Sequence, residues 1–153
     1  MTKSAKVLVL STLALVCAGI AQAQAGPPVA RVAVLRVQNP AIPNPDPSKP
    51  ADWLYKVRPA TVLADRDLKM MYVTNFTDLE MTVTLASDFP ADGKPSAPAD
   101  LPDSKRKRSI VKFKDLKGEK VDGVFSYEVT LKDAAGNSYA ADGESAPRVI
   151  IDP

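Results

Sequence analysis

The residues 123–132, near the C-terminal end of the chain, alternate between two kinds of side chain. The apolar set is Phe125, Tyr127, Val129 and Leu131, and the mostly polar set between them is Val124, Ser126, Glu128, Thr130 and Lys132. A β-strand sends successive side chains to opposite faces, so this pattern predicts a strand with one face on a core and the other toward water. The same alternation over 78–85 predicts a second half-buried strand.

The rest of the chain continues this pattern of short strands. Runs rich in β-branched and aromatic residues predict further strands over 30–38, 52–57, 68–74, 109–114, 137–141 and 148–151. No segment after residue 25 has a convincing helical hydrophobic period. We therefore predict an all-β fold, an antiparallel Greek-key β-sandwich of about seven to nine strands, cupredoxin-like or immunoglobulin-like.

The N-terminal residues have the features of an export signal. Lys3 and Lys6 form a short basic start, and the largely apolar stretch 7–20 is shorter than the about 20 residues that span a bilayer. Small residues then produce two overlapping cleavage patterns, which end at Ala23 and Ala25. We predict a signal peptide with a signal helix over 1–25, cleaved after Ala23 or Ala25, and no transmembrane segment in the mature chain.

The predicted mature chain, 26–153, is long enough to form one domain with its own core. Two proline-rich stretches, 39–50 and 89–104, interrupt the strands. Proline lacks an amide donor and fixes φ, so both stretches are predicted as loops at the surface of the domain.

Composition narrows the functions that the chain can have. There is no histidine, and the single cysteine, Cys17, lies inside the predicted signal peptide. Catalytic triads and imidazole metal sites are therefore excluded, and no phosphate-cradling glycine loop is visible.

The net charge of the predicted mature chain is zero. The 20 basic and 18 acidic residues become equal in number once Lys3 and Lys6 are removed, so global charge gives no argument for a nucleic-acid partner. We predict a protein that is not an enzyme and has no cofactor and no metal site.

Two apolar features have both a structural and a functional interpretation. Met70, Met71 and Met81 could offer thioether sulfur to cuprous copper, but Met70 and Met71 point to opposite faces of a strand, so core packing is expected. Trp53, the only tryptophan, is expected to fill the core rather than to stack on a ligand.

Asn75-Phe76-Thr77 matches the acceptor pattern for N-glycosylation. The pattern is only three residues long and matters only in a eukaryotic secretory pathway. The same residues favour a turn between two predicted strands.

The strongest local charge feature is the run Lys105, Arg106, Lys107 and Arg108. Four adjacent cations could hold a phosphate, a sulfate or a carboxylate-rich partner, which makes the run a candidate anion or partner patch. The simpler interpretation is a solvated loop whose charges protect a sheet edge from pairing.

The order of the motifs resembles a known family. Tyr55-Lys56-Val57-Arg58-Pro59 ends the tryptophan-bearing strand, Tyr72-Val73-Thr74-Asn75 ends a later one, and 147–153 closes the chain with Arg-Val-Ile-Ile-Asp-Pro after its proline. This resembles the small exported bacterial domains of the DP-EP type and, more broadly, the cupredoxin-like sandwich. The DP-EP-type domains have an Asp-Pro before their closing strand, where this chain has Ala146-Pro147. The resemblance implies a bacterial exported location, either the periplasm or the medium. In copper-binding cupredoxins two histidines and one cysteine hold the metal. The predicted mature chain has neither residue type, so the resemblance implies no electron transfer.

We therefore expect an exported, non-enzymatic binding or interaction module that contacts an envelope or extracellular protein. One alternative is a small-molecule or metal-ion carrier on a cupredoxin-like fold. Another is hydrolysis by a carboxylate pair that only the fold could bring together.

The export signal gives the first testable prediction. When a bacterium expresses the full chain, the intact mass of the exported product should correspond to a protein that begins at Gln24 or Gly26. A product that retains Met1 and sediments with the membranes would mean that 1–25 is an anchor.

Overall fold

The computed structural model describes residues 28–102, 104, 106–117, 121–142 and 146–152. The predicted signal helix and its cleavage sites lie outside these residues. The described part of the chain contains no α-helix, and its one helical turn is the 3₁₀ segment η1, Pro50–Asp52. No helix in it is long and apolar enough to cross a membrane. The fold is all-β, as predicted from the alternation.

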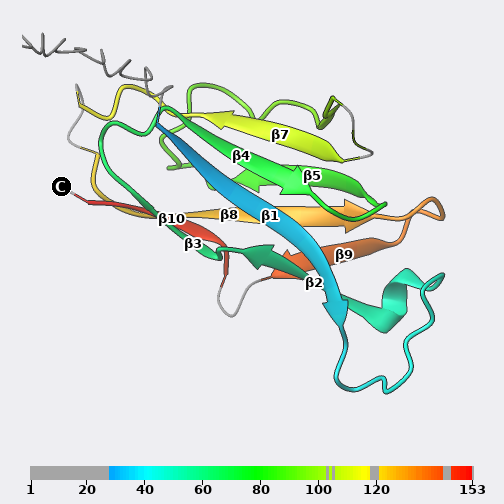
Figure 1. The fold of residues 1–153 in the computed structure, drawn as a ribbon. Coiled ribbons are helices and arrows are strands. Elements are labelled where there is room, and N and C mark those ends of the chain that lie inside the picture. Colours follow the sequence, from blue (N-terminus) through cyan, green and yellow to red (C-terminus); the bar gives the residue numbers. More distant parts are fainter. Residues whose placement is uncertain (1–27, 103, 105, 118–120, 143–145, 153) are drawn as a thin grey trace, which may run out of the picture.

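Ten strands make up the structure (Figure 1). They are β1 (Val29–Gln38), β2 (Trp53–Arg58), β3 (Thr61–Ala64), β4 (Met70–Asn75), β5 (Glu80–Leu85), β6 (Ala99–Asp100), β7 (Lys107–Lys112), β8 (Gly123–Lys132), β9 (Ser138–Asp142) and β10 (Arg148–Ile151). The sequence predicted all of them except β3 and β6. Strand β6 has two residues, too few for a pattern to be recognised, and β3 is a four-residue run that lies directly after β2 and Pro59.

The strands form one mixed sheet in the order β3-β10-β8-β9-β2-β1-β4-β7-β6, with β5 paired to β8 off this path. The pairs β1–β4, β3–β10 and β2–β9 are parallel, so the prediction of a purely antiparallel fold is wrong. Alternation specifies which face of a strand is buried, but it carries no information about the neighbouring strand or its direction. The parallel partners β1 and β4 are separated in the chain by β2 and β3, which allows the return that parallel pairing needs.

Strand β8 joins the parts of the fold, and in Figure 1 it runs behind β1. Its first residues pair with β10, and its later ones pair with β5 and β9. Its inward side chains Tyr127, Val129 and Leu131 are 1%, 3% and 0% exposed, so the face assignment made from the sequence is confirmed. Burial raises the pKa of the Tyr127 hydroxyl, which has no hydrogen-bond partner among the described residues.

One apolar core collects the inward side chains of β1, β2, β3, β4, β5, β7, β8, β9 and β10. Val32 and Val34 enter it from β1, and Met71 and Val73 enter it from β4. Met81 is buried there as well, whereas Met70 lies on the outer side of its strand. The core interpretation of the methionines is therefore confirmed for Met71 and Met81.

Trp53 does not fill the core, contrary to the prediction. It is half-buried at the margin of the core, and its indole Nε1 donates a hydrogen bond of 2.9 Å to the carbonyl oxygen of Asp46. The guanidinium carbon of Arg36 lies 4.5 Å from its ring centroid. The carboxylate of Asp52 accepts a further bond of 3.0 Å from the amide of Asp46. Trp53 thus anchors the proline-rich loop 39–50 to β2, because its polar N–H needs a partner that the core does not offer.

The burial of β8 generates a test of the fold. Val129→Asp should prevent folding, because an unpaired buried charge costs several kcal/mol, a large part of the stability of a small domain. Circular dichroism melting of the purified protein measures this. Ser126→Asp is the matched control, because Ser126 is exposed on the same strand and pairs in register with Arg148. A Val129→Asp protein that melts at the wild-type temperature would mean that Val129 faces solvent and that the inward and outward faces of β8 are inverted.

Candidate anion-binding face

Four neighbouring strands of the sheet, β2, β1, β4 and β7, contain no acidic residue at all. Their basic residues are Arg31, Arg36, Lys56, Arg58, Lys107, Arg108 and Lys112. Surfaces that serve solubility alone usually intersperse both signs of charge. A block of strands with one sign of charge is therefore a candidate site for an anionic partner.

The burial of apolar side chains in the core fixes the side of the sheet on which these basic residues lie. Because β1 buries Val32 and Val34, its residues Arg31 and Ala33 point to the opposite side, and the same parity applies in the three neighbouring strands. The pairing register places Arg58, Ala33, Thr74 and Arg108 in one row across the four strands. We call this outward side of β2, β1, β4 and β7, together with Phe76 after β4 and Arg106 before β7, the basic face.

Two arginines of the basic face share one aromatic ring. The guanidinium carbon of Arg108 on β7 lies 4.6 Å from the centroid of Tyr72, and that of Arg31 on β1 lies 5.8 Å from it. Tyr72 is on β4, between these two strands. The Nε of Arg108 also donates to the Thr74 hydroxyl at 3.4 Å. Cation–π contact restrains both guanidiniums without neutralising their charge.

A third arginine stacks at the end of β4. The guanidinium carbon of Arg106 lies 4.3 Å from the ring centroid of Phe76. The turn that holds Phe76 depends on Asn75, which is 1% exposed. Its Nδ2 donates to the carbonyl of Leu79 at 2.7 Å, and its Oδ1 accepts from the amide of Thr77 at 2.9 Å. The folded chain thus uses Asn75 as an internal turn residue, and its side chain is not accessible for glycosylation.

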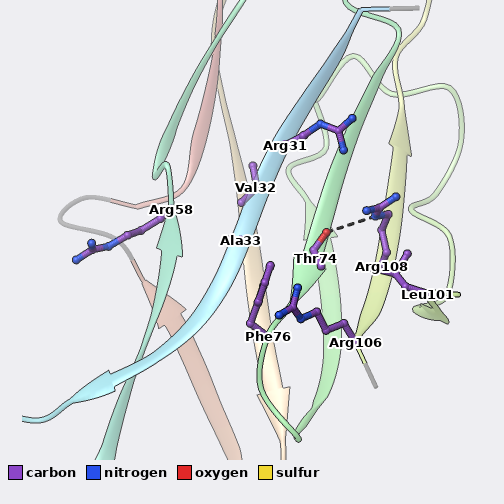
Figure 2. Close-up of a pocket in the computed structure, with 9 residues that line it drawn as sticks. All are labelled: Arg31, Val32, Ala33, Arg58, Thr74, Phe76, Leu101, Arg106 and Arg108. Carbon is purple, nitrogen blue, oxygen red and sulfur yellow. Dashed lines mark hydrogen bonds between the residues drawn. The ribbon is translucent and has the colours of Figure 1, made fainter. Parts of the chain in front are cut away.

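The three stacked arginines surround a hollow of about 240 Å³. Figure 2 shows the side chains of Arg31, Arg106 and Arg108 around Thr74, whereas Arg58 points away from them. Ion pairs between described residues include Lys49–Asp46, Lys69–Asp115 and Lys117–Asp67, and none of these three involves the arginines. Arginine has five N–H donors and no acceptor, so the hollow is lined by donors suited to phosphate, sulfate or carboxylate oxygens.

The structure divides the predicted patch between two sides of the sheet. Arg106 and Arg108 lie on the basic face, Lys107 lines a separate hollow with Asp78 and Glu80, and Lys105 lies outside the described residues. Strand β7 pairs with β6 at Lys107 and Arg108, so these two residues do not lie on an open sheet edge.

Sequence reasoning missed three members of the site, Arg31, Tyr72 and Phe76. Each comes from a strand or turn far from the run, and only the parallel pairing of β1 with β4 brings Arg31 to Tyr72. Three of the four strands predicted here contain no acidic residue, and the fourth, 52–57, has only Asp52 at its first position. This scarcity of acidic residues was the signal that could have found this face.

The described residues include no group of three His, Cys, Asp or Glu side chains placed to hold a metal ion. Comparisons of the chain with protein-family models, curated proteins and solved structures found no match. The function is therefore argued from the geometry of the basic face.

The role of Asn75 can be tested separately from binding. Asn75→Ala should lower the free energy of unfolding by about 1–3 kcal/mol, because it leaves buried backbone groups without partners. Urea unfolding measures the loss, and Asn44→Ala, at an exposed loop position, is the control. If the two variants unfold alike, the side chain of Asn75 does not hold the turn under Phe76.

Proposed function

We propose that this chain is an exported, non-enzymatic binding module that holds an anionic component of the bacterial envelope on its basic face. The observation that carries the proposal is the convergence of Arg31, Arg106 and Arg108 with no carboxylate partner among the described residues. The component is an envelope or extracellular protein with a carboxylate-rich or phosphorylated surface, or another polyanion of the envelope.

Two expectations from the sequence support the location and the fold class. The N-terminal residues have the pattern of an export signal, and the closing motifs resemble the DP-EP-type domains. Strands of alternating burial around one core are compatible with a β-sandwich, in which one side of each sheet faces water.

The stacked geometry favours binding for an energetic reason. A free arginine side chain loses rotamer entropy when it binds, a cost of about 0.5–1.5 kcal/mol for each immobilised side chain. Stacking on Tyr72 and Phe76 already restricts the rotamers of the three arginines in the free protein, so less entropy is lost when an anion binds. Exposed charges are screened by salt over about 8–10 Å, so the affinity should fall as ionic strength rises.

A comparison of two variants with the same net charge tests the proposal. The site variant carries Arg31→Gln, Arg106→Gln and Arg108→Gln, and the control carries Lys94→Gln, Lys107→Gln and Lys114→Gln. Titration with heparin, polyphosphate and polyaspartate should show at least about tenfold weaker binding for the site variant. The control should change little, because its lysines do not line the hollow among the arginines.

Stability must be checked in the same preparations. Each lost stacking contact should cost about 0.5–1 kcal/mol, so the three substitutions together should cost about 1.5–3 kcal/mol. This is less than the about 5–15 kcal/mol that stabilises a native domain, so the site variant should remain folded. Equal weakening by both variants would mean that the chain responds only to net charge, which would contradict a built site.

The carrier alternative has one supporting observation of its own. A hollow of about 500 Å³ is lined largely by apolar residues that include Val83, Leu85, Phe89 and Ala91. This size falls within the range of small-molecule sites. Failure of all three polyanions to bind would make this hollow the first place to look for a cargo.

A further inference from the structure

The basic face combines cations with apolar side chains and contains almost nothing else. Its cations include Arg31, Arg58, Arg106, Arg108 and Lys112. Its apolar side chains include Leu35, Met70, Tyr72, Phe76 and Ile110, each of them half-buried or exposed. Thr74 is the one neutral polar side chain on the outward side of the four strands, and it already accepts a hydrogen bond from Arg108. By register, a carboxylate lies at each border of the face: Asp142 on β9 pairs with Lys56, and Asp100 on β6 pairs with Lys107, whose side chain points to the opposite side of the sheet.

The aromatic rings of this face are not available for stacking on a ligand. Arg31 and Arg108 are both placed over Tyr72, and Arg106 is placed over Phe76. Single-stranded nucleic acid binds proteins largely through stacking of its bases on free aromatic faces. The face also lacks the carboxylate and amide side chains that would accept hydrogen bonds from sugar hydroxyls. Bases and neutral sugars therefore fit it poorly.

The cations are spread across the sheet rather than gathered at one point. Arg58 and Arg108 are separated by three strand spacings, roughly 14 Å between backbones at about 4.8 Å per strand. One compact ion cannot reach both. The spacing suits several anionic groups that lie in one plane.

Resting on the proposed function, we propose that the basic face docks on the anionic headgroup layer of a lipid membrane. The arginines contact headgroup phosphates, and the hollow among Arg31, Arg106 and Arg108 receives one of them. The apolar side chains Leu35, Met70 and Ile110 then lose their contact with water at the boundary between headgroups and acyl chains. A soluble polyanion would satisfy the arginines but would leave these apolar side chains in water, which is why the membrane is the better fit.

Vesicle sedimentation of the exported, processed protein tests this inference. The protein should bind vesicles of phosphatidylglycerol mixed with phosphatidylcholine and should not bind vesicles of phosphatidylcholine alone. A basic residue near an anionic surface contributes roughly a fivefold gain in partitioning. The variant with Arg31→Gln, Arg106→Gln and Arg108→Gln should therefore lose about a hundredfold, whereas the control with Lys94→Gln, Lys107→Gln and Lys114→Gln should lose only a few-fold.

A second variant isolates the apolar contribution. Ile110→Thr keeps a β-branched side chain in β7, so the strand should be preserved. It should weaken vesicle binding several-fold and leave polyphosphate binding unchanged. Unchanged vesicle binding by Ile110→Thr would overturn the inference, because the face would then respond to charge alone.

The outcomes separate this inference from the proposed function. Binding of soluble polyanions through the three arginines, without binding of anionic vesicles, would overturn the membrane inference and leave the binding module standing. Binding of neither would overturn both.

Discussion

The candidate site depends on one constraint, namely which alternate side chains of β2, β1, β4 and β7 face the core. The core requires Val32 and Val34 of β1, Met71 and Val73 of β4, and Val111 of β7 to face inward. Arg31, Tyr72 and Arg108 have the opposite parity on these strands, so they must face outward. A register slip of one residue would turn charged side chains into the core, where an unpaired charge is very costly. The core that stabilises the fold thus also gathers the charges on one face.

Stacking rather than ion pairing holds these charges in place, and this choice has functional consequences. Elsewhere in the described chain, Lys69 pairs with Asp115 and Lys117 pairs with Asp67, so each of these lysines is opposed by a carboxylate. On the basic face an aromatic ring takes the place of the carboxylate. A ring restrains a guanidinium through its face but leaves the positive charge and the N–H edge available. This is the arrangement on which the proposed binding of an anion depends.

Much of the fold could be predicted from the sequence, because the alternation of β5 and β8 is a local property of the chain. The strand directions could not be predicted, since the parallel pairs β1–β4, β3–β10 and β2–β9 are made by residues far apart in the sequence. The same limit explains the incomplete site. Lys107 and Arg108 are adjacent in the chain, yet the pleat sends them to opposite sides, whereas Arg31 and Arg108 are distant in the chain and share Tyr72.

Arg36 shows how the same contact can serve structure instead of binding. It stacks on Trp53 as Arg108 stacks on Tyr72, and its Nη1 also donates to the carbonyl of Pro47 at 3.2 Å. One of its donors is thus directed to the backbone of the proline-rich loop, and it lies at the inward parity of β1 although its side chain is exposed there. Arg31 lies five residues earlier on β1 and on its opposite side. Among the described residues, no backbone carbonyl accepts a hydrogen bond from its guanidinium. On this strand, Arg36 therefore has an acceptor within the chain, whereas the proposed role of Arg31 requires an acceptor from a partner.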